Sequence, residues 1–254
     1  MITRLNHKPL AGWRVLVPRG GEWGNSVAAT LRQKGAVPVI APMTNFAATE
    51  NSEELAHSFT RLSDGEFEWL VVTSSTTVDV LVGHAVRVPE HTKIAAVGES
   101  TTSALVLAGY RVDLAPAKDN SSRGLVKEWR SAPPKERVLV PQSEDSDDVL
   151  VTGLIELGIA VEFVTAYRTV GVAVPRDVAD DVASGAIQGV LITSGSVARQ
   201  IQTQLAPLPE ETVVAAIGPR TAFDARAAGI RVDVIAESRT ADALVAALIE
   251  GVVR

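Results

Sequence analysis

The sequence repeats itself, and this repeat is the feature that most restricts the fold. Residues 14–18 read Arg-Val-Leu-Val-Pro, and the same five letters return at residues 137–141. Residues 95–98, Ala-Ala-Val-Gly, return as Ala-Ala-Ile-Gly at residues 215–218, and the neighbouring strand and turn positions keep the same spacing. Because the repeat spans whole strand and helix units, it predicts two similar lobes whose units either follow one another or interleave.

Strand-like and helix-like segments alternate along nearly the whole chain. Short apolar strands are predicted at residues 13–18, 69–73, 93–97, 110–114, 137–141, 190–193, 213–217 and 231–235. Helices are predicted at residues 26–34, 52–62, 75–82, 101–109, 121–130, 147–157, 178–184, 196–205, 221–228 and 240–250. This alternation predicts the α/β class, with parallel sheets covered by helices on both faces.

Two extended stretches connect the repeated blocks. Residues 161–170, Val-Glu-Phe-Val-Thr-Ala-Tyr-Arg-Thr-Val, are dense in β-branched and aromatic residues and are predicted to form a strand. Residues 37–47 occupy the equivalent place in the other copy. We expect both stretches to join the two lobes, and a cleft between lobes is the default place for a ligand.

The composition excludes several classes of protein. The chain carries 24 Lys and Arg against 30 Asp and Glu, a net charge of −6, and has no basic block, which argues against a nucleic-acid surface. It has no Cys, so disulfides, thiolate catalysis and Cys-ligated metals are excluded. No apolar run has the length of a membrane span, and residues 1–9 lack the apolar segment of an export signal, so the expected location is the cytoplasm.

Small hydroxyl residues follow four of the predicted strands, in the turns 73–75, 98–101, 193–196 and 218–221. In a parallel α/β sheet such turns carry free backbone N–H groups at helix N-termini, which bind anions. The alternative is that Ser and Thr only cap the helices. Four such turns, on both lobes, favour a ligand with several carboxylates or phosphates. The candidate binding residues are Ser74, Ser75, Thr101, Ser194, Gly195, Ser196, Gly218 and Thr221.

Common nucleotide and hydrolase motifs are missing. The chain has no Gly-x-Gly-x-x-Gly after a strand, no Walker loop and no Gly-x-Ser-x-Gly elbow. Its four His residues lack metal-ligand spacing and are predicted to be surface or hydrogen-bonded polar residues. The acidic run 144–148 could hold Mg²⁺, but a solvated turn that favours the N-terminus of the next helix is the preferred interpretation.

Several motifs, taken in order, resemble those of uroporphyrinogen-III synthase. They are Val-Leu-Val-Pro-Arg near the start, Val-Thr-Ser-Ser, Ala-Ala-Val-Gly-x-x-Thr, Ala-Tyr-Arg-Thr on the crossing strand, Ile-Thr-Ser-Gly-Ser, and Ala-Ile-Gly-Pro-x-Thr-Ala. Each motif is short, but their order and spacing cover the chain from Gly12 to Ile249.

The resemblance implies two Rossmann/flavodoxin-like lobes joined by a two-stranded β-ladder, with the chain interleaved between them. Lobe one would comprise residues 1–41 and 169–254, lobe two residues 47–162, and the linkers residues 42–46 and 163–168. The resemblance also implies a carbon–oxygen lyase of tetrapyrrole and heme biosynthesis that uses no cofactor. This enzyme would cyclise the linear tetrapyrrole hydroxymethylbilane with loss of water, invert ring D through a spiro intermediate, and release uroporphyrinogen III.

The same resemblance implies a monomer that binds the acetate and propionate carboxylates on all four substrate rings. Whether the chain also contacts hydroxymethylbilane synthase, the enzyme that makes the substrate, stays open. The competing interpretation is a two-lobed small-molecule binding or regulatory protein without turnover.

Two polar residues break the repeat. Tyr167 aligns with Thr44, and Arg19 with Gln142, so neither has a counterpart in the other copy. Tyr167 matches the family's Tyr, which implies that it helps the substrate hydroxyl leave, since a phenol keeps its proton at neutral pH and can donate it. The alternative is a ring packed between the lobes.

Arg19 is the candidate for holding a carboxylate, or else forms a surface salt bridge. At Gln142 the family often has basic residues, so no carboxylate contact is expected from that turn.

Overall fold

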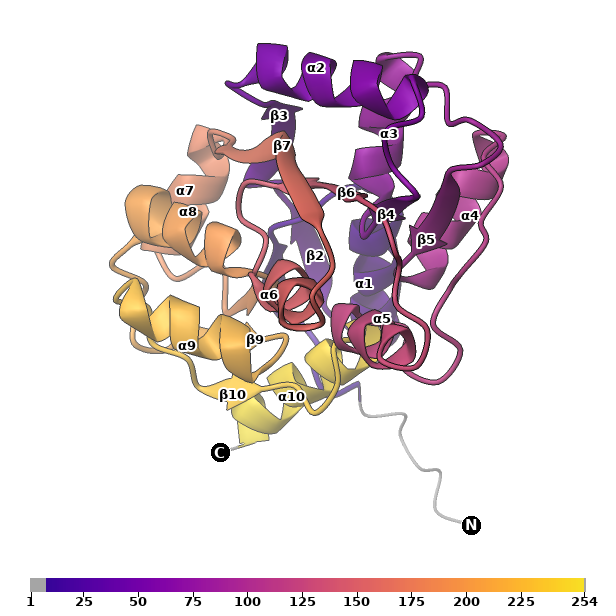
Figure 1. Cartoon of the computed structure of the whole chain (residues 1–254). Helices are drawn as coiled ribbons and strands as arrows, with labels where there is room; N and C mark the ends of the chain where they lie inside the picture. Colours follow the sequence, from indigo (N-terminus) through magenta and orange to yellow (C-terminus); the bar gives the residue numbers. More distant parts are fainter. Residues whose placement is uncertain (1–7, 254) are drawn as a thin grey trace. The chain divides into compact units, whose positions relative to one another are not determined.

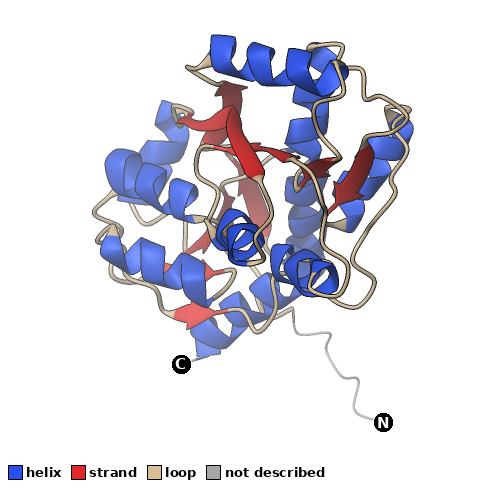
Figure 2. Ribbon diagram, in the orientation of Figure 1, coloured by secondary structure: helices blue, strands red, loops and turns tan. Residues whose placement is uncertain are grey.

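The structure is a computed structural model that describes residues 8–253 (Figure 1). The chain divides into two compact units. Unit 1 combines the chain up to Asn45 with the chain from Val170 onward, and unit 2 is Phe46–Thr169. Strands alternate with helices in both units (Figure 2), so the predicted α/β class with an interleaved chain is confirmed. Within residues 8–253, no helix combines the length and the apolar character needed to cross a membrane.

Unit 1 is built on a sheet in the order β10–β9–β8–β1–β2, in which every neighbouring pair is parallel. Its strands are β1 (Arg14–Val17), β2 (Val37–Ile40), β8 (Gly189–Ile192), β9 (Val213–Ala216) and β10 (Val234–Ile235). Successive side chains of a strand point to opposite faces, so Leu16 and Ile192 enter one apolar layer while Val15 and Leu191 enter the other.

Helices cover both faces of this sheet. On the Leu16 face lie α7 (Arg176–Ala183), α8 (Gly195–Leu205) and α9 (Pro219–Ala227), and on the Val15 face lie α1 (Gly21–Gln33) and α10 (Ala241–Val253). The helix after β8 therefore covers one face and the helix after the neighbouring β1 covers the other. Such a topological switch point is where open parallel sheets bind ligands, at the carboxyl ends of the strands.

Unit 2 repeats the design with the order β3–β7–β6–β4–β5. Its strands are β3 (Thr44–Ala48), β4 (Trp69–Val72), β5 (Lys93–Ala96), β6 (Val138–Ser143) and β7 (Val161–Gly171). One face carries α2 (Ser52–Ser63), α3 (Ser75–Gly83) and α4 (Glu99–Leu107), and the other carries α5 (Ser122–Trp129) and α6 (Val149–Glu156). The switch point of unit 2 lies between β4, which leads into α3, and β6, which leads into α6.

Two predicted strands are shorter than expected. The strand predicted at residues 110–114 is a single bridge between Leu114 and β5, and the one predicted at residues 231–235 is only β10. The reason is the same in both copies of the repeat. The Asp113 carboxylate accepts a hydrogen bond from a backbone N–H of β5 at 2.9 Å, and Asp233 accepts one from β9 at 2.8 Å. A side chain thereby takes the place of a ladder hydrogen bond.

The two extended connections are strands of the sheets. Residues 37–47 form β2 in one sheet and most of β3 in the other. Residues 163–168, which the sequence assigns to a linker, continue β7 and pair with β6 as far as Tyr167. The run of β-branched and aromatic residues suits a sheet, and its pairing places these residues in unit 2.

Candidate functional site

Tyr167 lies on β7 directly after an irregularity in the strand. Gln142 of β6 pairs with Thr165, but the next residue, Ser143, pairs with Tyr167, so Ala166 is an extra residue. An inserted residue of this kind reverses the face to which the following side chains point. The Tyr167 ring therefore enters the core layer under α2, α3 and α4.

The Tyr167 hydroxyl is held by the N-terminus of α3. Tyr167 is 7% exposed, and its Oη donates a hydrogen bond to Ser74 Oγ at 3.1 Å. Ser74 is the N-cap of α3, because its Oγ accepts from the backbone N–H of Thr77 at 3.1 Å and lies 2.9 Å from Thr77 Oγ1. The structure therefore joins the predicted catalytic residue directly to a predicted binding residue. Ser75 follows as the exposed first residue of the helix.

A pocket of about 440 Å³ lies beside Tyr167 within unit 2. Residues of β3 and β7 line it together with residues of α2 and α3, and Leu55 and Val80 give it apolar walls while Asp79 and His84 add polar groups. The Phe46 ring, which also lines it, meets the Tyr167 ring edge-on with 5.2 Å between centroids. No local sequence pattern marks Asp79 or His84 as pocket residues, because the lining comes from segments far apart in the chain.

The turn after β8 contacts α9 in unit 1. Ser194 is the N-cap of α8, and its Oγ accepts from the backbone N–H of Val197 at 3.2 Å. A Cβ atom at Gly195 would lie 2.8 Å from Asp224 Oδ2, and Asp224 is itself paired with Arg220 at 3.1 Å. Glycine at position 195 therefore lets the start of α8 approach the Asp224 side chain of α9 closely. Ser196, half-buried, completes this turn.

Three of the predicted binding residues can offer a ligand only their backbone groups and not their side chains. Thr101 is 2% exposed and Thr221 is 5% exposed, so both hydroxyls are enclosed. Thr101 follows Gly98, whose N–H donates to Asn120 Oδ1 at 2.6 Å. Gly218 is the buried N-cap of α9 with an extended backbone. Any ligand contact at Thr101, Gly218 or Thr221 would therefore use the N–H groups of the helix N-termini.

Arg19 extends from the end of β1, next to β8 at the switch point of unit 1. The side chain is exposed, and its Cζ lies 5.5 Å from the centroid of the Trp23 ring on α1. Within residues 8–253 no acidic side chain forms an ion pair with it, so the guanidinium can receive a carboxylate.

The acidic run 144–148 has a structural role at the start of α6. Asp148 is the N-cap residue, and Asp147 Oδ1 accepts from the backbone N–H of Val149 at 3.3 Å. In the part of the chain that the structure describes, no group of three or more His, Asp or Glu side chains is arranged to hold a metal ion.

Two doubly wound, mostly parallel sheets with capped helix N-termini at their switch points define a two-unit α/β protein. The family model described as uroporphyrinogen-III synthase HemD matches residues 25–246. The chain belongs to this family, and the resemblance identified in the sequence is confirmed.

Individual relatives agree with this assignment. The porphyrin biosynthesis protein HemD of Ruminiclostridium josui is 27% identical over 251 residues, which is 96% of this chain and 49% of that protein, so the chain spans about half the length of this curated relative. A mutant uroporphyrinogen III synthase from the extremely thermophilic bacterium Thermus thermophilus matches with a TM-score of 0.60 and 16% identity, over 94% of this chain and 98% of its own. The uroporphyrinogen-III synthetase from Helicobacter pylori 26695 matches with a TM-score of 0.63 and 16% identity, over 92% of this chain and 96% of its own. At this identity the two structures show the common fold.

Proposed function

We propose that the chain is a uroporphyrinogen-III synthase, a carbon–oxygen lyase that cyclises hydroxymethylbilane with loss of water and inversion of ring D. The observation that carries this proposal is the family match over residues 25–246, which contains Tyr167 and the four hydroxyl-rich turns. The proposal is also supported by a phenol held at a helix N-terminus in unit 2 and by Ser-capped helix N-termini in both units.

The substrate carboxylates would be bound at the carboxyl ends of the strands. In unit 1 the donors are the Arg19 guanidinium and the turn 194–196, and in unit 2 they are Ser74 and Ser75 at the start of α3. The enclosed residues Thr101, Gly218 and Thr221 would contribute backbone N–H groups. Helix N-termini suit this task because their N–H groups and dipoles favour negative charge without requiring a net positive protein.

Tyr167 would assist the departure of the substrate hydroxyl. The hydroxyl leaves as water when a proton reaches it, and a phenol can donate that proton or a strong hydrogen bond. Ser74 Oγ accepts the Tyr167 hydrogen bond in this structure. When the phenol turns to the substrate, the Ser74 hydroxyl can donate to the phenol oxygen in return, which stabilises the negative charge that develops there.

The test is to incubate the purified chain with hydroxymethylbilane and to separate the cyclised products by isomer. Formation of the ring-inverted isomer above a sample without protein supports the enzyme. Binding of the tetrapyrrole with no excess of the inverted isomer would instead support the non-catalytic binding protein. We also propose that the active form is a monomer that needs no cofactor, so turnover should persist in a chelator and follow the monomer peak in light scattering.

A further inference from the structure

One face of α5 gathers three cations. Arg123, Lys127 and the C-cap residue Arg130 follow one another at spacings of four and three residues, which places them on the same side of the helix. Like charges at these spacings repel each other and weaken a helix. The arrangement therefore does not stabilise α5 by itself.

The three cations surround a pocket of about 320 Å³ between α5 and α6. Arg123, Lys127 and Arg130 line it together with Val126 from the same helix and Val149 from the first turn of α6. The helices approach closely here because α6 carries Gly153, where a Cβ atom would lie 2.8 Å from a methyl carbon of Val126. The volume is in the range of small-molecule sites.

Among the described residues, no acidic side chain lines this pocket. Within residues 8–253, none of the three cations has an ion-pair or hydrogen-bond partner for its side chain. Glu128 of the same helix is engaged elsewhere, since its Oε1 accepts from the backbone N–H of Ala117 at 3.0 Å. Asp147 accepts from the first turn of α6.

Several arginines of this acidic chain are paired, as Arg61 is with Glu162 at 2.8 Å, but within residues 8–253 none of these three cations is. The three α5 side chains therefore form a concentration of unpaired positive charge, and they do so around a pocket with an apolar floor.

We propose that the pocket between α5 and α6 binds a small anion with two or more negative charges, either a polyphosphate or a polycarboxylate. Two guanidinium groups can each bind an oxyanion with paired N–H donors, and Lys127 adds a point charge. The site is distinct from the Tyr167 site, because α5 and α6 cover the opposite face of the unit 2 sheet from α2, α3 and α4.

Isothermal titration of the full chain with pyrophosphate and, separately, with citrate at low ionic strength tests the proposal. We expect saturable binding of at least one anion, weakened about tenfold or more in the triple variant Arg123→Gln, Lys127→Gln, Arg130→Gln. The matched control is Arg32→Gln, Lys34→Gln, Arg87→Gln, which removes the same charge from exposed positions outside the pocket. Its affinity should stay within about twofold, as expected for screened distant charges.

A second variant keeps all three cations. Val149→Glu places a carboxylate in the pocket at the first residue of α6, where a negative charge suits the helix dipole. The variant should fold normally and lose anion binding, because the new carboxylate competes with the added anion for the three cations. A preference for pyrophosphate assigns the site to phosphates, and a preference for citrate assigns it to carboxylates. The proposal is overturned if neither anion saturates, or if both triple variants lose affinity equally. Because no turnover is measured, this result is independent of the proposed enzyme activity.

Discussion

Tyr167 and Ser74 lie 93 positions apart in the sequence and share a hydrogen bond of 3.1 Å between their hydroxyl oxygens. The bond links β7 to the N-terminus of α3, because Ser74 also caps that helix. The positive end of the α3 dipole favours negative charge at this position.

Replacing Tyr167 by Phe should lower kcat for ring-inverted product by about 10 to 100-fold, because the proton donor is lost. The fold should persist, since Ser74 keeps its contacts with Thr77. Product-isomer kinetics and a thermal melt measure both effects.

The matched control is Tyr110→Phe, which removes the other tyrosine hydroxyl of the chain and its hydrogen bond to the carbonyl of Val86. This control should lose stability and keep kcat. Full turnover by Tyr167→Phe would show that the Tyr167 ring only fills space and that its hydroxyl has no part in catalysis.

Gly195→Ala should destabilise unit 1 by about 1 to 3 kcal/mol, the usual range for overpacking. The added methyl group would lie 2.8 Å from Asp224 Oδ2. Adding Asp224→Ala removes that oxygen but keeps a Cβ atom 3.1 Å from the added methyl group, so it should recover part of the loss. Asp224→Ala alone breaks only a pair with exposed Arg220 and should have little effect. Urea unfolding of the three variants measures the coupling. If the double variant is no more stable than Gly195→Ala, the contact with Asp224 does not determine how closely the start of α8 approaches α9.

The sequence predicted the alternation of strands and helices, because apolar strands and capped helices leave local patterns. The repeat predicted two similar units, and the structure gives both the same Asp-to-strand hydrogen bond, from Asp113 and from Asp233. The bulge at Ala166 had no local signal, although it decides which face of the sheet Tyr167 occupies. The bond from Tyr167 to Ser74 and the pocket between α5 and α6 depend on which elements pack together, and a single sequence does not contain that information.

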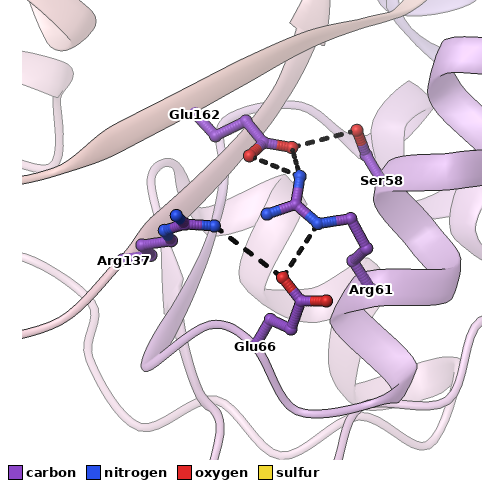
Figure 3. A network of polar contacts seen from close by, with 5 residues as sticks. All are labelled: Ser58, Arg61, Glu66, Arg137 and Glu162. Carbon is purple, nitrogen blue, oxygen red and sulfur yellow. Dashed lines mark hydrogen bonds and ion pairs between the residues drawn. The ribbon is translucent and has the colours of Figure 1, made fainter.

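Arg61 holds α2 onto the start of β7, as Figure 3 shows. Its guanidinium contacts both carboxylate oxygens of Glu162 at 2.8 Å and also binds Glu66 at 2.9 Å. The Arg61 side chain is 18% exposed and Glu162 is 30% exposed, so the pair is partly shielded from solvent. Among the residues drawn in Figure 3, Arg61→Met leaves only the Ser58 hydroxyl as a partner of the Glu162 carboxylate. We expect this change to lower the free energy of unfolding by about 1 to 3 kcal/mol.

A double-mutant cycle with Glu162→Gln isolates the interaction. The two changes together should destabilise less than the sum of the single changes, because the double variant has no Glu162 carboxylate left without its Arg61 partner. Strict additivity in urea unfolding would show that the pair contributes nothing beyond packing.

Glu68 should make stability depend on pH. Desolvation raises its pKa, but hydrogen bonds from the backbone N–H groups of Glu136 and Lys135, at 2.8 and 2.7 Å, contribute to a net lowering below the ordinary value. A lowered folded pKa means that the stabilisation is complete above the unfolded pKa of about 4.3 and is lost as the pH falls through the folded value. Glu68→Gln should therefore be less stable than the wild type at neutral pH, and the difference should shrink in acid. A difference that stays constant from about pH 7 to about pH 3 would contradict this assignment.

The interleaved chain predicts which fragments can fold. A fragment of residues 44–171 contains every strand of the β3–β7–β6–β4–β5 sheet with the helices on both faces, and we expect it to unfold cooperatively by itself. A fragment of residues 1–132 has nearly the same length but lacks β6 and β7, and it also separates β1 from β8. Neither of its sheets is complete, so it should be unfolded or aggregated.

The shorter fragment 47–162 keeps only the first two residues of β7, which exposes the edge of β6, so it should be less stable than 44–171. Circular dichroism with urea unfolding compares the three, and a soluble, cooperatively unfolding fragment 1–132 would contradict the interleaving.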